Sequence, residues 1–147
     1  MRVSDNHEVR ARLEMHTNAE LSFDLDAVMA TVDDDPCFEW HPVGRAASGR
    51  DEVRRMYSVF LPRWRDLAES AALRFEVRSE FWHDRARIRE QVAFVTNEAG
   101  HLDRHEFVVV VELGEHGVTA ERTYGADAFH RLMLGGLFDE LTPIDRR

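Results

Sequence analysis

Apolar residues in the first half of the chain recur at intervals of three and four residues, the spacing of one face of an α-helix. This pattern predicts helices over residues 4–18, 25–32 and 48–62. Asp24 is placed to cap the second helix, because an aspartate before the first turn can accept hydrogen bonds from its free N–H groups. Between the second and third helices, the segment 37–43 is short and bounded by prolines, as is typical of an edge strand.

The spacing changes at Leu73, where apolar and polar residues begin to alternate. A period of two predicts strands, because successive side chains of a strand point to opposite faces. Turn-forming residues separate the later segments, so neighbouring strands are expected to pair antiparallel. The predicted strands are 73–83, 86–96, 104–113 and 118–124, and a helix over 127–134 and a polar tail follow them.

Helices followed by a run of strands predict an α+β fold. We expect a curved antiparallel sheet of four long strands, joined by the short strand around Phe38, to wrap the N-terminal helices as a cone. A cone of this kind has a pocket at its open end, and an apolar pocket with a few polar groups is the usual ligand site. The chain shows no internal repeat and no long linker, so residues 1–147 are expected to form a single domain.

The charge balance argues against nucleic acid as a partner. The 147 residues include 28 Asp and Glu against 19 Lys and Arg, for a formal net charge of −9 at pH 7. Phosphate backbones are bound by concentrated positive charge, so we expect no nucleic-acid partner. All 19 of the cations are arginine, a bias typical of a GC-rich bacterial genome.

The cysteine and histidine residues argue against a metal or disulfide framework. Cys37 is the only cysteine, which excludes a disulfide within the chain and a cysteine-based metal cage. The 8 histidines form no His-x-x-His or His-Glu-x-x-His pattern, and no calcium-binding loop is present. We therefore expect no metal site and no other cofactor.

The hydropathy of the chain gives no indication of a membrane segment. The N-terminal residues are charged and lack the apolar stretch of a signal peptide. The longest apolar run, Phe107–Val111, is much shorter than the roughly 20 residues that span a bilayer. We expect a cytoplasmic protein without a membrane partner.

Four segments of the chain resemble a known superfamily: DLDAVMA at 24–30, DDDPCFEWHPVG at 33–44, GRDEVRRMY at 49–57 and GVTAERTY at 117–124. They are similar to the nuclear-transport-factor-2-like superfamily, and within it to the SnoaL-like polyketide cyclase and ketosteroid isomerase branch. The resemblance implies the same cone-shaped fold. It implies no single activity, because this fold hosts isomerases, cyclases, dehydratases, epoxide hydrolases and inert binding domains.

The resemblance makes two histidines candidate catalytic residues. In ketosteroid isomerases an aspartate base directly precedes Pro-Val-Gly, and His41 holds that place here after one inserted residue, Trp40. His16 falls where the family has its oxyanion-holding tyrosine. A neutral histidine can act as a base, and its N–H can donate a hydrogen bond. The alternative is structural: His41 satisfies backbone groups at a strand edge, and His16 is half-buried on a helix face.

Arg104, His105 and Glu106 form a second candidate constellation. It is similar to the Arg-x-Asp pair of limonene-epoxide-hydrolase-like enzymes, although Thr123 stands where those enzymes have a further aspartate. Alternation along the strand places His105 on one face and Arg104 and Glu106 on the other. If the more apolar face points inward, the charged pair lies outside or contacts a second copy of the chain.

The remaining candidates are a carboxylate, a histidine and a set of aromatic residues. Glu90 interrupts an apolar strand face, so it is either a pocket carboxylate or a partner of an arginine. His83 ends a strand, either at the pocket mouth or in solvent. The aromatic set either lines a ligand pocket or packs in the core. Its members are Trp40, Tyr57, Phe60, Trp64 and Tyr124.

Two classes of function stay open from the sequence. One is a cofactor-independent isomerase, cyclase or dehydratase that acts by general acid–base catalysis on a small apolar carbonyl or polyketide-like compound. The other is a non-catalytic domain that binds a small-molecule ligand, and an epoxide-hydrolase-like enzyme is a third, weaker alternative. We also expect a homodimer through the outer sheet face, because both faces of the strand 104–113 carry valines.

Overall fold

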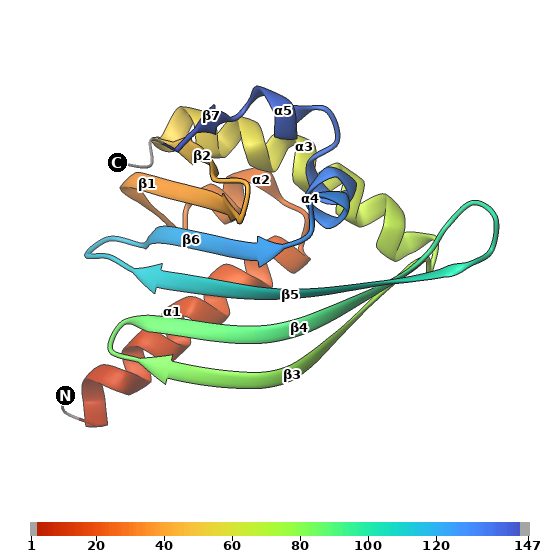
Figure 1. The fold of residues 1–147 in the computed structure, drawn as a ribbon. Helices are drawn as coiled ribbons and strands as arrows, with labels where there is room; N and C mark the ends of the chain where they lie inside the picture. Colours follow the sequence, from red (N-terminus) through yellow and green to blue (C-terminus); the bar gives the residue numbers. More distant parts are fainter. Residues whose placement is uncertain (1–2, 145–147) are drawn as a thin grey trace.

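A curled seven-stranded sheet packed against helices forms the fold of the computed structural model, which describes residues 3–144 (Figure 1). In chain order the elements are α1 (Val3–Leu21), α2 (Leu25–Met29), β1 (Val32–His41), β2 (Arg45–Ser48), α3 (Arg50–Glu69), β3 (Leu73–His83), β4 (Ala86–Thr96), β5 (Leu102–Leu113), β6 (Val118–Gly125), α4 (Asp127–Leu134), α5 (Leu137–Glu140) and β7 (Thr142–Pro143). The predicted α+β class is confirmed. Within the described residues, no helix is long and apolar enough to cross a membrane.

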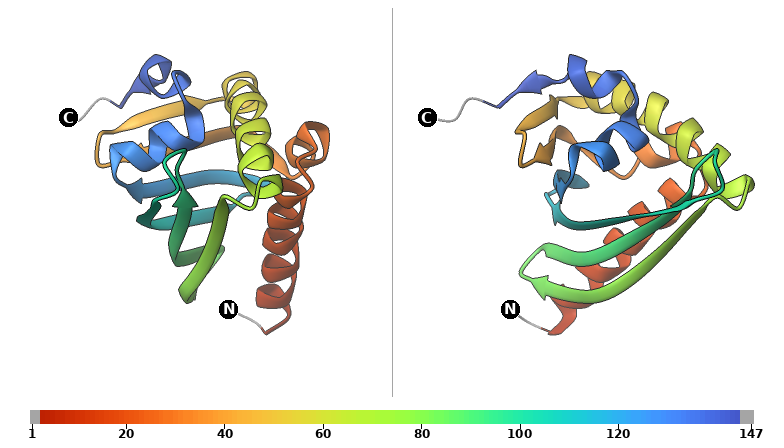
Figure 2. Two further views of the ribbon diagram at one scale, coloured as in Figure 1. Left: turned by 90° about the vertical axis from the view of Figure 1, so that its right-hand side faces the viewer. Right: turned by 45° about the vertical axis from the view of Figure 1, so that its right-hand side comes forward.

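The sheet has the strand order β3-β4-β5-β6-β1-β2-β7 and curls toward the helices (Figure 2). Five of its six pairings are antiparallel, as predicted. The pairing of β1 with β6 is parallel, so the expectation of a wholly antiparallel sheet is wrong at this position. The path of the chain explains it: α3 leads to the far edge of the sheet, and the meander β3 to β6 returns beside β1 in the same direction.

Several element boundaries follow the sequence pattern, and others differ from it. β3 and β4 have the predicted bounds, and Asp24 caps α2 by accepting a hydrogen bond from the N–H of Ala27 (3.1 Å). α3 continues past Pro62 to Glu69, because Trp64 in its last turns packs against the core. Where the sequence predicts a polar tail, the chain forms α5 and β7.

The acidic run Asp33-Asp34-Asp35, which directly follows the predicted helix 25–32 and is expected to end it, lies inside β1 instead, and α2 ends earlier, at Met29. Asp33 is buried, and its carboxylate accepts hydrogen bonds from the backbone N–H groups of Asp34 (2.7 Å) and His116 (3.3 Å). These bonds compensate for the burial of the charge, so the segment can pair within the sheet. β1 is therefore a ten-residue inner strand instead of a short edge strand.

The register of three strands determines which side chains share the inner face of the sheet. Arg87 of β4 pairs with Val111 of β5, and Val111 pairs with Glu121 of β6, so the three form one row. Helices α1 and α3 lie on the same side of the sheet (Figure 2). Arg87 Nη2 donates a hydrogen bond to Thr17 Oγ1 of α1 (2.9 Å). The first helix thus packs inside the curve of the sheet, as the fold prediction requires.

Candidate functional site

A cavity of about 120 Å³ lies between the inner face of the sheet and the helices α1, α3 and α4. An enclosed cavity of roughly 150 Å³ can hold benzene, and this somewhat smaller space is partly open to solvent, so a ring bound in it could extend outward. The apolar lining residues are Trp40, Met56, Tyr57, Phe60, Trp64, Phe75, Phe107, Val109, Val111, Phe129 and Met133. The polar lining residues are Thr17, Glu20, Arg87, Arg89, Gln91, Glu121, Thr123 and His130.

Aromatic rings in mutual contact form the apolar wall. Trp64 lies edge-on to Phe60 and stacks on Phe75, with ring centroids 4.8 and 4.7 Å apart. Phe107 of β5 stacks on Phe129 of α4 at 4.3 Å. These contacts fix the orientation of the rings. Four of the residues predicted to bind a ligand are in this lining: Trp40, Tyr57, Phe60 and Trp64.

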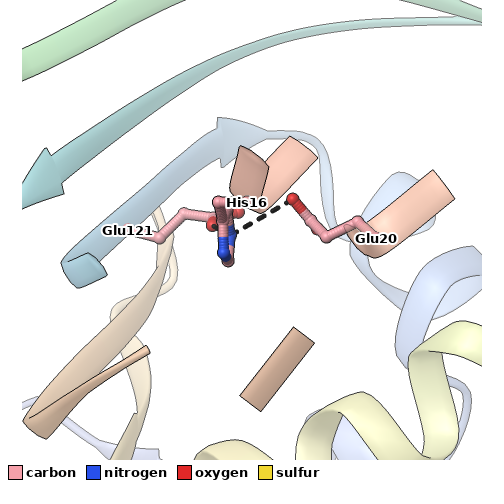
Figure 3. Close-up of side chains that lie close together, drawn as sticks. All are labelled: His16, Glu20 and Glu121. Carbon is pink, nitrogen blue, oxygen red and sulfur yellow. Dashed lines mark ion pairs between the residues drawn. The ribbon is translucent and has the colours of Figure 1, made fainter. Parts of the chain in front are cut away.

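A buried histidine joins two carboxylates in the polar part of the cavity (Figure 3). His16 Nε2 lies 3.2 Å from Glu20 Oε1, one turn further along α1, and 3.7 Å from Glu121 Oε2 of β6. The hydroxyl of Tyr57 in α3 lies 3.3 Å from the same nitrogen. Glu20 and Glu121 line the cavity, whereas His16 is fully buried and is not among the lining residues. His16, the predicted hydrogen-bond donor, therefore contacts the carboxylates of Glu20 and Glu121 without itself lining the cavity.

Burial and mutual charge raise the pKa values of Glu20, His16 and Tyr57 above their ordinary values. Burial raises the pKa of Glu20 to about 7; the positive charge of His16 opposes the rise and the negative charge of Glu121 adds to it. Burial acts to lower the pKa of His16, but the two carboxylates outweigh it and the pKa is raised. Burial, together with the same carboxylates, also raises the pKa of Tyr57. A carboxyl group with a pKa near neutrality can both accept and donate protons in catalysis.

Arg87 is a buried cation in the polar lining. It is 5% exposed, and its Nε and Nη1 atoms have no hydrogen-bond partner among the described residues. Burial lowers the pKa of Arg87, and the positive charge of Arg89 acts in the same direction. Arg89, in contrast, forms an ion pair with Glu80 at 2.6 Å. Of these two arginines, Arg87 is the one whose hydrogen-bonding capacity is unused.

His130 is a second buried histidine at the cavity. Its Nε2 lies 2.9 Å from the carbonyl oxygen of His41, which can only accept, so Nε2 carries the proton. Burial lowers the pKa of His130, which favours the neutral ring. Its Nδ1 has no partner among the described residues. The neutral ring therefore leaves one unshared acceptor beside the cavity.

His41, the predicted base, is not among the residues that line this cavity. It follows Trp40 in β1, and neighbouring residues of a strand point to opposite faces, so an inward Trp40 places His41 outside. There its Nε2 lies 2.9 Å from Glu39 Oε2, and its ring stacks on Tyr124 with centroids 5.0 Å apart. Tyr124 is itself 42% exposed. The structure therefore does not bring His41 and His16 to one cavity.

Arg104 and Glu106 lie on the outer face of β5 and not in the cavity. Arg104 Nη2 lies 2.6 Å from Glu106 Oε1, and Arg78 lies 3.2 Å from the same oxygen. Val109 has the opposite parity along β5 and lines the cavity. The hypothesis that Arg104 and Glu106 lie in the pocket is therefore wrong, and the alternative that they form a charged pair on the outside of the sheet agrees with the structure.

The other charged candidates also lie outside the cavity lining. Glu90 alternates with the inward Arg89, so its carboxylate points outward and accepts a hydrogen bond from the Ser79 hydroxyl (2.9 Å). The His83 side chain is 83% exposed at the end of β3. His105 is on the inner face, where its ring lies 5.7 Å from that of Phe129, but it is not among the lining residues.

The cluster around His16 also contains the side-chain types that bind metal ions. One ligand atom each from His16, Glu20 and Glu121 lies within 4.8 Å of the other two. Imidazole and carboxylate ligands suit several divalent ions. The sequence shows no spaced motif for this group, because its members come from α1 and β6. His16 Nε2 and Glu20 Oε1 form an ion pair at 3.2 Å, whereas Glu121 Oε2 has no hydrogen-bond partner among the described residues.

Sequence reasoning missed Glu20, Glu121 and Arg87 as members of the site. Glu20 follows His16 by one helical turn, so their shared helix face was an available signal. Arg87 has the same strand parity as the buried Ala93, and a charged residue on a buried face marks a special environment. Glu121 gave no local signal, because its place depends on the register of β6 against β5 and β1.

Comparison of the sequence with models of known families and with curated proteins gave no match. Three solved structures illustrate the similarity of the fold. The epoxide hydrolase/cyclase-like enzyme SalBIII, which has a role in pyran ring formation in the polyether salinomycin, has a TM-score of 0.62 and 17% identity, over 84% of this chain and 95% of its own. A protein from Jannaschia sp. CCS1, assigned as a SnoaL-like polyketide cyclase, has a TM-score of 0.59 and 13% identity, over 90% and 93%.

The third structure is Rv0760c from Mycobacterium tuberculosis in complex with estradiol-17beta-hemisuccinate. It has a TM-score of 0.59 and 14% identity, over 82% of this chain and 95% of its own. All three similarities cover most of both chains. Structures described as nuclear-transport-factor-2-like proteins are also similar, so the chain has the fold of that superfamily, shared with SnoaL-like polyketide cyclases.

Proposed function

We propose that this protein is an enzyme that moves protons on a small, largely apolar carbonyl compound by general acid–base catalysis. The observation that carries the proposal is the pair of carboxylates, Glu20 and Glu121, which line an apolar cavity and share the buried His16. The class of reaction is the one predicted from the sequence, but the base moves from His41 to Glu20. No cofactor is required, because the side chains themselves supply the proton acceptor.

Glu20 is the proposed base. Its ionised carboxylate accepts a proton from the carbon beside a carbonyl group, and the electrons of the broken C–H bond move to the carbonyl oxygen to form an enolate. Thr123 and Gln91, which line the same cavity, carry O–H and N–H donors for that oxygen. Return of the proton to a different carbon completes an isomerisation. Alternatively, attack of the enolate carbon on a second carbonyl group closes a ring, and the alkoxide that forms takes the proton back from Glu20.

His16 and Tyr57 are positioning residues in this scheme. Their contacts behind Glu20 restrict the orientation of its carboxylate. The aromatic wall excludes water and holds an apolar ring beside the base. The reactions of two structural neighbours agree with the proposed class: one is a cyclase-like enzyme that acts in pyran ring formation, and the other is assigned as a polyketide cyclase.

Proton exchange on a simple ketone tests the proposal without knowledge of the natural substrate. β-Tetralone combines an aromatic ring with acidic protons beside a carbonyl group, and their replacement by deuterium can be followed by NMR. We expect the protein to accelerate this exchange and Glu20→Gln to reduce the acceleration by about 10²–10⁴-fold. Glu14→Gln, the same change at an exposed position of α1, serves as the matched control. Full acceleration in Glu20→Gln would show that Glu20 is not the base.

The apolar wall supports a second candidate, a domain that binds a small molecule without changing it. Trp40 and Trp64 line the cavity, so tryptophan fluorescence reports binding directly. Binding of β-tetralone with no acceleration of exchange, for this ketone and for a panel of related ones, would assign the protein to this second class.

We also propose the homodimer through the outer sheet face. Val108 and Val110 lie on that face with intermediate burial, and Phe81 of β3 is 61% exposed. Light scattering at micromolar concentration tests this assembly, and a monomer mass would contradict it. The cytoplasmic location and the lack of a nucleic-acid partner stay predictions from the sequence.

A further inference from the structure

Arg87 supplies a positive charge to the cavity that the proposed proton transfer does not use. Its guanidinium is nine-tenths buried, and one of its nitrogens, Nη2, donates to Thr17. The other two nitrogens, Nε and Nη1, have no hydrogen-bond partner among the described residues. Buried polar groups in folded proteins are nearly always hydrogen-bonded, so an unsatisfied buried guanidinium at a cavity wall points to a partner that arrives with the ligand.

The charges around Arg87 identify the sign of that partner. Glu20 and Glu121 both contact His16, and neither forms an ion pair with Arg87 among the described residues. Arg89 is balanced by Glu80 and brings no free positive charge. Arg87 therefore has no ion-pair partner among the described residues, and a buried cation without one attracts an anion.

We propose that Arg87 binds a carboxylate of the ligand, so that the compounds this cavity takes are carboxylic acids with an apolar ring body. A carboxylate accepts charge-assisted hydrogen bonds from arginine, which are stronger than those to a neutral carbonyl oxygen. The aromatic wall holds the ring while Arg87 holds the acid group. This inference rests on the proposed function in taking the cavity as the ligand site, and it adds the chemical class of the ligand.

The acid group is tested by binding alone, with a matched pair of probes. β-Naphthoate and β-naphthamide have nearly the same shape, but the first carries a carboxylate and the second a neutral amide. We expect the wild type to bind β-naphthoate about 10-fold or more tightly than β-naphthamide, by calorimetry or tryptophan fluorescence. Arg87→Gln should abolish this preference, and Arg87→Lys, which keeps the charge, should retain part of it.

Arg54→Gln is the control, because Arg54 lies in α3 outside the cavity lining, with its side chain 50% exposed and paired with Asp26. Its preference for the carboxylate should remain close to that of the wild type. If Arg87→Gln does not fold, the Nε–H NMR resonance of Arg87 in the wild type should still shift with β-naphthoate and not with β-naphthamide.

Equal binding of the two probes by the wild type would overturn the inference, as would a preference that survives Arg87→Gln or is lost in Arg54→Gln. None of these outcomes affects the test of the proposed function, because exchange on β-tetralone needs no carboxylate in the substrate. Conversely, a clear preference for β-naphthoate without exchange on any ketone would retain the acid subsite and reject the enzyme.

Discussion

His16 Nδ1 lies 2.7 Å from Thr31 Oγ1, and the direction of this hydrogen bond is fixed by a third group. The Thr31 hydroxyl donates its one proton to the carbonyl oxygen of Val28 (2.6 Å), so its oxygen must accept from His16. Nδ1 therefore carries a proton in the neutral and in the charged ring. The proton that His16 gains or loses is the one on Nε2, which faces Glu20 and Tyr57.

Replacement of the acceptor should destabilise the fold without altering its shape. Thr31→Val keeps the volume but leaves the buried Nδ1–H of His16 without a partner, which costs about 1–3 kcal/mol of unfolding free energy. Thr119→Val makes the same chemical change in β6, at a partly buried position where the hydroxyl has no described hydrogen bond, and should stay within about 0.5 kcal/mol of the wild type. Urea unfolding measures both. Equal stability of the two variants would contradict the fixed direction of the bond.

The exchange rate should rise with pH and then level off. Glu20 acts as a base only when ionised, and its pKa in the folded protein is about 7. The rate of β-tetralone exchange above the uncatalysed background should therefore increase through neutral pH, with a midpoint near that value. An exposed glutamate would give a midpoint near its ordinary value of 4.5. A profile that is flat between about pH 6 and about pH 8 would reject Glu20 as the base.

Stability should fall as the pH rises across the same range. Because the pKa of Glu20 is raised above 4.5, the folded state binds this proton more tightly than the unfolded chain does, and the advantage is lost as the pH passes about 7. The raised pKa of His16 acts in the same direction: its contribution is present below 6.5 and is lost above the folded value.

Glu20→Gln should flatten this dependence, because the glutamine does not titrate and His16 loses one of the two carboxylates that raise its pKa. Unfolding free energies at about pH 5 and about pH 8 measure the slope. Glu14→Gln on the exposed side of α1 should keep the wild-type slope. An equally steep fall in Glu20→Gln would mean that other groups control it.

Removal of metal ions should leave exchange unchanged. The proposed scheme uses only side chains to accept and return protons, so a chelator has nothing to remove from the working enzyme. Added Zn²⁺ should inhibit instead, because the ligand atoms of His16, Glu20 and Glu121 lie within 4.8 Å of one another. Activity that is lost with a chelator and restored by one metal would assign this cluster to a metal ion.

Local patterns predicted the elements well because each pattern reports one property of the backbone. The alternation from Leu73 to His83 corresponds to β3 residue for residue, since a half-buried strand needs that period. The prediction failed at the acidic run before Pro36, because the charge of Asp33 is compensated by backbone N–H groups. One of these groups belongs to His116, in a turn far away in the sequence. A hydrogen bond over that sequence distance leaves no trace in the local composition.

The candidate site was less predictable because it depends on register and on strand parity. Trp40 and His41 are neighbours on β1, so only one of them can face the cavity. From the sequence alone, both were candidates for the site. Arg87 and Glu121 come into one row only through their pairing with Val111 across β5. That row is a property of the assembled sheet and not of any one strand.

The docking of α1 inside the curled sheet has a consequence for the dynamics of the chain. His16, Glu20 and Thr17 belong to this N-terminal helix, while Arg87 and Glu121 belong to the sheet. A ligand bound between them would contact both the helix and the sheet, so its binding free energy would stabilise the packing of α1 against the sheet. Backbone amides of α1 would then exchange with solvent more slowly as more of the protein has ligand bound. The hydrogen-exchange rate of this helix therefore reports the fraction of protein that is occupied.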